Sequence, residues 1–307
     1  MQSQKKFIKV LFSISLLFCF LACSDEVAME SVAEKECQIG FNMRWRDTPP
    51  LSNNLTNAIS GMKPDLLRYP GGTLAHKWNW KTGLPTPNNS NDVVHPISDV
   101  KKMAEATQTE VMFVVDIVNS SIANQIEMLK ASNVSVNYVE IGNELYSDHY
   151  ENIFPSGKSY ADTINSWVPE LKKHFPHAKY GVCMIGRAAG NDRRNAWNHE
   201  VSQNIEVSID AYIYHIYVSE NETVTDRIER FEQRFVKNSG KETWITEFGA
   251  HSHTLEQTNE ISNYVESIAD IALNHCLISA SGNFSKIDDQ SVYTLEGLLF
   301  VDRNKNK

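Results

Sequence analysis

The stretch Tyr138-Val139-Glu140-Ile141-Gly142-Asn143-Glu144-Leu145 begins with a short, largely apolar run and then reaches a glycine and an asparagine, which favour turns. A run of four to eight such residues is typical of a strand buried on both faces, as in a parallel sheet covered by helices. The same pattern, a short apolar run followed by a glutamate and a glycine, occurs in Trp244-Ile245-Thr246-Glu247-Phe248-Gly249. Both runs end in a glutamate, so the sequence predicts buried parallel strands with carboxylates at their ends.

Runs of this kind recur along the chain and alternate with amphipathic segments. The predicted strands are Gln38 to Met43, Leu66 to Tyr69, Val111 to Ile117, Tyr138 to Ile141, Tyr180 to Ile185, Ala211 to Ile216, Thr243 to Thr246 and Cys276 to Ser279. The predicted helices, whose apolar residues recur at intervals of three and four, are Leu55 to Met62, Ile97 to Ala106, Ile122 to Ala131, Ser159 to His174, Ala196 to Asn204, Val224 to Asn238, Thr258 to Asn274 and Leu295 to Val301.

Eight strand and helix units in order predict an α/β fold, a (β/α)8 TIM barrel that forms a single domain over residues 37–307. A doubly wound open sheet is the structural alternative. Such a sheet normally carries a G-x-G-x-x-G fingerprint after its first strand, and Gly71-Gly72 does not fit it. The barrel is therefore favoured.

Composition and charge restrict the partners. The formal net charge of −9 disfavours binding to nucleic acid. It only mildly disfavours a polyanionic substrate, because a negative total is compatible with a local basic cleft. The charge of the substrate therefore stays open. No H-E-x-x-H motif or zinc-type cysteine spacing occurs. We expect no metal and no organic cofactor.

The N-terminus has the features of an export signal. Lys5, Lys6 and Lys9 precede the apolar stretch Val10 to Ala22, whose 13 residues are too few to span a bilayer. The ending Leu21-Ala22-Cys23 resembles the lipobox of bacterial lipoproteins. That resemblance implies a signal peptide over residues 1–22, lipidation of Cys23, a tether over 23–36 and anchoring in the bacterial cell envelope. An uncleaved short anchor and an ordinary signal peptide with an incidental cysteine are the alternatives.

Two carboxylates at strand ends indicate the chemistry. Active sites of TIM barrels lie at the carboxyl ends of the strands, and strands four and seven lie across the mouth, so Glu144 and Glu247 are expected to converge. Cleavage of a glycosidic bond needs such a pair. A separation of about 5–5.5 Å gives retention of configuration and about 6.5–9.5 Å gives inversion. We expect retention.

Several motifs resemble one enzyme clan. Gly142-Asn143-Glu144 and Thr246-Glu247-Phe248-Gly249 are similar to the acid/base and nucleophile motifs of the 4/7 superfamily of TIM-barrel glycosidases. Residues 67–72 (Leu-Arg-Tyr-Pro-Gly-Gly) and 78–83 (Trp-Asn-Trp-Lys-Thr-Gly) resemble the second-strand region of α-L-arabinofuranosidases and, less closely, of heparanase-like β-glucuronidases and β-xylosidases. The resemblance implies a retaining glycoside hydrolase acting on a carbohydrate, with Glu144 as general acid/base and Glu247 as nucleophile.

The same resemblance implies roles for four further residues. Arg68 would hold the nucleophile ionised, Asn143 would bind the 2-hydroxyl of the sugar, and His215 and Tyr217 would orient the two carboxylates. Simpler interpretations are that Arg68 pairs with Asp65 and that His215 and Tyr217 are core residues.

Two expectations concern the environment of the site. Trp80 would either stack on a sugar ring or pack at the barrel rim. Glu144 would need a raised pKa to be protonated near neutrality.

Two other function classes remain open. A non-catalytic carbohydrate-binding surface lipoprotein would be expected to lack one carboxylate. A polysaccharide lyase would need a base and a charge neutraliser but not both glutamates. The presence of Glu144 and Glu247 favours the hydrolase over both.

Overall fold

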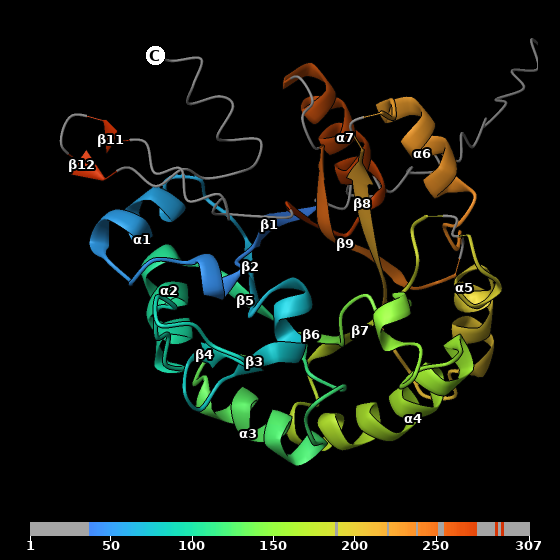
Figure 1. Ribbon diagram of the computed structural model, residues 1–307, viewed down its shortest axis with the longest axis horizontal. Coiled ribbons are helices and arrows are strands. Elements are labelled where there is room, and N and C mark those ends of the chain that lie inside the picture. The colour runs from blue at the N-terminus through green and yellow to red at the C-terminus, as the bar shows by residue number, and fades with distance from the viewer. Residues whose placement is uncertain are drawn as a thin grey trace, which may run out of the picture. The chain divides into compact units, whose positions relative to one another are not determined.

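The computed structural model of the protein describes residues 37–187, 190–219, 221–237, 239–250 and 255–274, and the pairs 286–287 and 290–291. Eight parallel strands close into a barrel in the order β1-β10-β9-β8-β7-β6-β5-β2 (Figure 1), which confirms the predicted TIM barrel. The barrel strands are β1 (Gln38–Asn42), β2 (Leu66–Tyr69), β5 (Glu110–Val115), β6 (Tyr138–Ile141), β7 (Lys179–Cys183), β8 (Ala211–Val218), β9 (Glu242–Ala250) and β10 (Ile271–Asn274).

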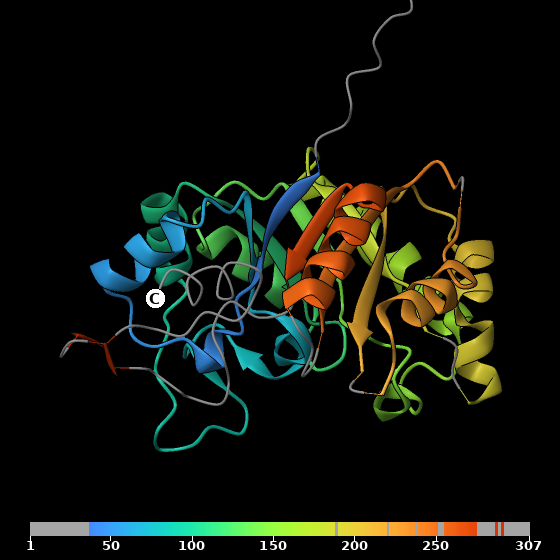
Figure 2. The same cartoon turned by 90° about the horizontal axis from the view of Figure 1, so that it is seen from above.

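Helices lie outside the ring of strands, as Figures 1 and 2 show. They are α1 (Asn53–Ser60), α2 (Ser98–Thr107), α3 (Ile122–Ala131), α4 (Gly157–His174), α5 (Asp192–Asn204), α6 (Val224–Glu232) and α7 (Leu255–Ile268). The connecting segments contain the 3-10 turns η1 (Trp45–Asp47), η2 (Gly72–Lys77) and η3 (Asp148–Tyr150), a small hairpin of β3 (Trp78–Asn79) and β4 (Leu84–Pro85), and a second pair, β11 (Lys286–Ile287) and β12 (Gln290–Ser291).

Polar residues placed before the helices determine where most of them begin. The side chains of the N-cap residues of α1, α3, α4, α5 and α6 each accept a hydrogen bond from a backbone N–H of the first helical turn. Such a cap stabilises a helix by about 1 kcal/mol, because it satisfies a donor that the helix itself cannot. The caps are Ser52, Ser121, Ser156, Asn191 and Thr223.

Alternation along the strands separates an apolar barrel floor from a polar mouth. The floor is a buried cluster of Leu66, Met112, Tyr138, Ala211, Ile213, Trp244, Ile271 and Leu273. Because side chains two apart share a face, the residues that follow Leu66, Tyr138 and Ile213 by two positions also point into the barrel, one layer higher. These are Arg68, Glu140 and His215.

The eighth strand lies earlier in the chain than the sequence predicts. β10 spans Ile271–Asn274, which was predicted as the end of a helix, and it pairs with β1 and β9. The prediction was wrong because a continuous apolar run fits the helical and the strand period equally. The chain turns at Asp270, whose carboxylate accepts the backbone N–H of Thr243 at 2.7 Å.

Some predictions concern parts of the chain that the structure does not describe. Cys23, the signal peptide and tether, the stretch Cys276 to Ser279 and the helix Leu295 to Val301 lie outside the described residues. Among the helices that are described, none is long and apolar enough to cross a membrane. The described side chains also include no group of three or more His, Cys, Asp or Glu residues arranged to hold a metal ion.

Candidate active site

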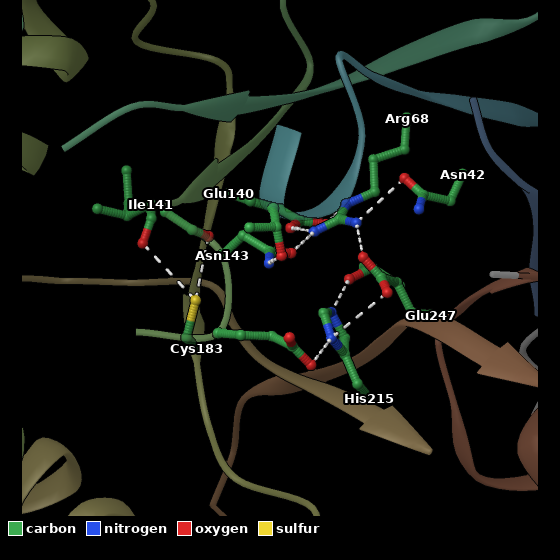
Figure 3. Close-up of polar contacts among 12 residues, drawn as sticks. Asn42, Arg68, Glu140, Ile141, Asn143, Cys183, His215 and Glu247 are labelled. Atoms are coloured by element: carbon green, nitrogen blue, oxygen red, sulfur yellow. Dashed lines mark hydrogen bonds and ion pairs between the residues drawn. The ribbon is translucent and has the colours of Figure 1, made fainter. Parts of the chain in front are cut away.

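The guanidinium of Arg68 lies at the centre of the barrel mouth and joins two carboxylates (Figure 3). Its Nε and Nη2 donate to Glu140 Oε1 and Oε2 at 2.9 and 2.6 Å, and Nη1 donates to Glu247 Oε1 at 2.6 Å. The remaining hydrogen bonds go to the side-chain oxygens of Asn42, at 3.1 Å, and Asn143, at 2.8 Å. Asp65, the alternative partner considered for Arg68, accepts the backbone N–H of Ile39 through its side chain. The guanidinium of Arg68 pairs with the carboxylates at the barrel mouth.

Arg68 and Glu140 form a wholly buried ion pair. Both side chains are 0% exposed, and the two parallel hydrogen bonds have the fork geometry in which arginine binds carboxylates most strongly. Burial would lower the pKa of Arg68, but the charges of Glu140 and Glu247 raise it, so the guanidinium stays charged. Arg68 therefore presents a permanent positive charge to Glu247.

A β-bulge in β9 turns Glu247 into the barrel. Tyr214 of β8 pairs with Ile245, but the next residue, His215, pairs with Glu247, so Thr246 is an extra residue in the ladder. Without this bulge, strict alternation from the inward-facing Trp244 would point Thr246 inward and Glu247 towards the helices. With the bulge, Glu247 reaches Arg68.

Tyr217 holds the second oxygen of Glu247. The Tyr217 hydroxyl donates a short hydrogen bond to Oε2 of this carboxylate. Burial, together with the negative charge of Glu247, raises the pKa of Tyr217 well above its ordinary value, so the hydroxyl keeps its proton. Gly72 completes the enclosure, because a Cβ at this position would lie 3.0 Å from Glu247 Oε1.

Glu144 follows β6 in a strained backbone conformation. Its φ of 47° lies in the left-handed region, which costs a residue with a side chain on the order of 1 kcal/mol and is found most often at functional sites. Its Oε1 accepts the hydroxyl of Tyr146 at 3.0 Å and Nδ1 of His215 at 2.9 Å. The carboxylate is 31% exposed, so a ligand can reach it.

His215 links the two glutamates. Its Nδ1 lies 2.9 Å from Glu144 Oε1 and 3.8 Å from Glu247 Oε2, while Nε2 contacts the hydroxyl of Thr246 at 3.2 Å. The sum of the first two distances, about 6.7 Å, is the largest possible separation of those two oxygens. Glu144 and Glu247 therefore converge at the mouth, as the sequence predicts.

The charges around His215 decide where the proton lies. Burial raises the pKa of Glu144, but the hydrogen bond and charge of His215 outweigh burial and lower it to about 2. Burial lowers the pKa of His215, but the negative charge of Glu247 and the hydrogen bond to Glu144 raise it. Both pKa shifts favour an ionised Glu144 beside a positively charged His215 in the substrate-free protein, which is opposite to the raised pKa expected for Glu144.

His76 supports the loop that carries Glu144. The backbone N–H of Asn143 donates to His76 Nε2 at 3.1 Å, and His76 Nδ1 contacts Asp116 Oδ1 at 3.2 Å. The tautomer with its hydrogen on Nδ1 satisfies both contacts. Asn143 itself is 1% exposed, and its amide nitrogen contacts Thr73 Oγ1 at 3.5 Å, the limit of a hydrogen bond.

The mouth is divided into two cavities, one at each glutamate. The Glu247 cavity, of about 440 Å³, is lined by Asn42, Arg44, Arg46, Asp47, Gly71, Gly72, Thr73, Leu74, Lys77, Tyr217 and Glu247. The Glu144 cavity, of about 180 Å³, is lined by Glu144, Tyr146, Ser147, Ile185, Gly186, Arg187, Arg194, His215, Tyr217 and Arg227. Tyr217 borders both, so the two cavities adjoin between the carboxylates.

Trp80 lies apart from the two glutamates. It is 8% exposed, its Nε1 donates to Asn124 at 3.3 Å, and it lines a third cavity of about 590 Å³ with Trp78 and His76. The structure does not place Trp80 in either glutamate cavity.

Sequence reasoning missed Glu140, Tyr146 and Thr246. The signal for Glu140 was present, because a carboxylate inside an apolar strand needs a buried cation, and Arg68 occupies the equivalent position in β2. No local pattern identifies Tyr146 or Thr246, because their partner groups lie on other segments of the chain.

Known proteins share parts of this sequence and fold. Residues 156–304, just under half of the chain, match the family model described as "Glycosyl hydrolase catalytic core". No curated protein matches the sequence.

The fold is similar to that of several solved structures at low sequence identity. An α-L-arabinofuranosidase from Thermotoga maritima, solved as an arabinose complex, has a TM-score of 0.61 at 16% identity over 83% of this chain and 66% of its own. A curdlan-specific exo-β-1,3-glucanase from Blastomyces gilchristii has a TM-score of 0.51 at 14% identity, and the match covers 79% of this chain and 92% of the glucanase. A β-glucuronidase from Bacteroides uniformis has a TM-score of 0.51 at 12% identity, and the match covers 80% of this chain and 31% of the glucuronidase. The chain spans about two thirds of the length of the Thermotoga enzyme.

Replacing Glu140 is expected to destabilise the protein strongly. Glu140→Ala leaves the Arg68 charge buried without its closest partner, which costs about 3–5 kcal/mol of unfolding free energy. Glu140→Gln keeps the shape and one acceptor and is expected to cost less. Denaturant unfolding of both variants measures the difference. A loss below about 1 kcal/mol in Glu140→Ala would show that the pair does not hold the site together.

Stability is expected to depend on pH through His215. A histidine with a raised pKa stabilises the fold fully below its unfolded value of about 6.5, and this contribution is lost as pH rises through the folded pKa. Glu144, whose pKa is lowered, contributes above about pH 4.5 and loses its contribution as pH falls towards 2. Unfolding free energy should therefore decrease above about pH 6.5, and less so in His215→Gln.

The matched control for this pH series is His199→Gln, because His199 is an exposed histidine on α5. Unfolding midpoints recorded across the same pH range should follow the wild type in this control. Parallel curves for wild type and His215→Gln would contradict the assignment of the proton to His215.

Proposed function

We propose that this chain, a relative of the TIM-barrel glycosidases in sequence and fold, is itself a retaining glycoside hydrolase. Glu247 acts as the nucleophile and Glu144 as the general acid/base. The observation that carries the proposal is the convergence of these carboxylates on His215, which places Glu144 Oε1 and Glu247 Oε2 no more than about 6.7 Å apart. Retaining enzymes hold the two groups about 5–5.5 Å apart and inverting ones about 6.5–9.5 Å, so this upper limit includes the retaining separation and only the shortest inverting ones.

The first step forms a covalent glycosyl-enzyme. A Glu247 oxygen attacks the anomeric carbon while the bond to the leaving oxygen breaks, and that oxygen takes a proton from Glu144. Arg68 and Tyr217 keep the Glu247 carboxylate ionised and oriented for attack. Because the resting proton is on His215, it passes to Glu144 along their 2.9 Å hydrogen bond as the leaving oxygen becomes basic.

The second step releases the sugar. Water attacks the anomeric carbon, gives a proton to Glu144, and the bond to Glu247 breaks, so the configuration is retained overall. This step needs Glu144 ionised, which it is because its proton has gone to the leaving oxygen in the first step.

Two supporting roles belong to the same proposal. The amide of Asn143 would bind the 2-hydroxyl of the reacting sugar, since Arg68 holds its oxygen and, within the described part of the chain, its nitrogen makes one long contact, to Thr73. The protein would act at the bacterial cell envelope through lipid on Cys23, a proposal that rests on the sequence of the N-terminus alone.

A substrate screen tests the hydrolase. The purified protein is assayed on aryl α-L-arabinofuranosides, β-D-xylosides, β-D-glucosides and β-D-glucuronides and on plant, algal and host polysaccharides. We expect turnover of at least one substrate, a loss of about 10³-fold or more in Glu247→Ala, and a first product with the starting anomeric configuration by NMR.

The matched control for the screen is Glu242→Ala. Glu242 starts the same strand at the opposite end of the barrel, where it pairs with Lys179 at 2.6 Å, so activity should persist. Turnover near wild type in Glu247→Ala would refute the nucleophile. Binding of a glycan without any turnover would favour the non-catalytic binding protein.

The acid role of Glu144 predicts a dependence on the leaving group. Glu144→Ala should lose activity steeply on substrates with poor leaving groups and much less on dinitrophenyl glycosides, because the latter need little protonation. The slope of log(kcat/KM) against leaving-group pKa measures this. A slope unchanged from wild type would exclude Glu144 as the acid.

A further inference from the structure

Positive charge gathers at the Glu144 cavity although the chain carries a net charge of −9. Arg187, Arg194 and Arg227 line the cavity. Among its lining residues, all within the described part of the chain, Glu144 is the single carboxylate, and His215 already pairs with it. The described residues that line the cavity therefore carry an excess of positive charge.

Arg227 supplies a fixed charge beneath the cavity. It is 1% exposed, and its guanidinium donates to the carbonyls of Tyr217 at 3.0 Å, Gly186 at 2.9 Å and His215 at 3.4 Å. Burial lowers its pKa to about 10, the charge of Glu222 opposes this, and the neighbouring charge of Arg187 lowers it further. Since carbonyls carry no net charge, its own contacts leave the charge of Arg227 uncancelled.

Arg194 presents a buried donor without a partner. Within the described residues its Nε is buried and forms no hydrogen bond, while its guanidinium lies 5.8 Å from the ring centre of Tyr146. The adjacent Arg193 is a useful contrast, because its guanidinium donates to the carbonyls of Leu145, Tyr146 and Phe154. Arg193 therefore holds the loop together, whereas among the described residues the Arg194 guanidinium forms no hydrogen bond, so its terminal nitrogens remain available to a ligand in the cavity.

Arg187 lies at the open side of the same cavity. It is exposed, and its contact is a 3.4 Å approach of Nη1 to Ser219 Oγ. A guanidinium held this loosely remains available to form the paired hydrogen bonds that arginine makes with carboxylate and sulfate oxygens.

The Glu247 cavity differs in how its arginines are paired. Arg44 pairs with Asp47 at 2.9 Å and Arg46 with Asp92 at 3.1 Å, and Lys77 is the further basic residue of its lining. The uncompensated guanidinium groups therefore lie on the Glu144 side of the mouth, where the general acid meets the departing sugar.

We propose that the Glu144 cavity is a subsite for an anionic substituent, a carboxylate or a sulfate ester, on the sugar unit that leaves. The placement on the leaving unit rests on the proposed role of Glu144 as the acid. An oxyanion there would pair with Arg194 and Arg187 above the charge of Arg227. The substrate is then an acidic polysaccharide or oligosaccharide, which the net charge of the chain would not suggest.

Binding measurements test the subsite without requiring turnover. Glu247→Gln, which keeps bound ligand intact, is titrated by calorimetry with oligogalacturonates, which carry carboxylates, with κ-carrageenan oligosaccharides, which carry sulfate esters, and with neutral laminari-oligosaccharides. We expect at least one anionic series to bind more tightly than the neutral one. Its affinity should fall as salt rises from about 0.05 to about 0.5 M.

Arginine variants locate the binding. Arg194→Gln and Arg187→Gln, each made in the Glu247→Gln background, should weaken the anionic ligand roughly tenfold. Arg187 is exposed, so its replacement does not threaten folding. Lys101→Gln removes a positive charge from the exposed face of α2, where Lys101 approaches Glu105 at 3.6 Å, and should leave affinity unchanged.

The outcomes separate the subsite from the proposed activity. Failure of both anionic series to bind, or equal affinity in the arginine variants, would overturn the subsite while leaving hydrolysis of a neutral glycan possible. Arginine-dependent binding of one series supports the subsite and identifies its group as carboxylate or sulfate. Such binding in a protein without turnover on acidic or neutral glycans would refute the hydrolase but leave the anion site standing.

Discussion

A guanidinium removed completely from water is costly unless it is paired, and in this barrel two carboxylates compensate Arg68. Glu140 lies in the layer above the apolar floor and accepts hydrogen bonds from the Arg68 guanidinium through both of its oxygens. Glu247 receives the remaining strong hydrogen bond, and Asn42 and Asn143 bind the same guanidinium. Because residues from β1, β2, β6 and β9 meet on one cation, closure of the barrel and assembly of the site are the same event.

The carboxylates at the mouth differ in their surroundings. Arg68 and Tyr217 surround Glu247, and both favour its ionised form. Glu144 meets a group that can give up its proton, His215, and stays partly open to solvent. The strained backbone of Glu144 shows that the surrounding loop imposes its position.

Charge is distributed unevenly over the molecule, and the distribution carries more information than the total. Aspartates neutralise the arginines of the Glu247 cavity, whereas those of the Glu144 cavity bind carbonyls, an aromatic ring or one distant hydroxyl. A cleft lined by one sign of charge concentrates ligands of the other sign even when the net charge of the protein opposes them. The net charge of the chain therefore does not exclude an anionic ligand at the Glu144 cavity.

The sequence by itself determined the barrel, because buried parallel strands and capped amphipathic helices are local patterns, and it identified Glu144, Glu247 and Arg68 from motifs at strand ends. It misplaced the eighth strand, since the apolar run of β10 fits two periods. Only the tertiary structure decided the bulge at Thr246, the Arg68–Glu140 pair and the raised pKa of His215 beside the two glutamates. Each of these features depends on groups that are far apart in the chain but close in space. Hydrogen bonds and charge interactions depend on distance in space, and a local sequence pattern does not encode that distance.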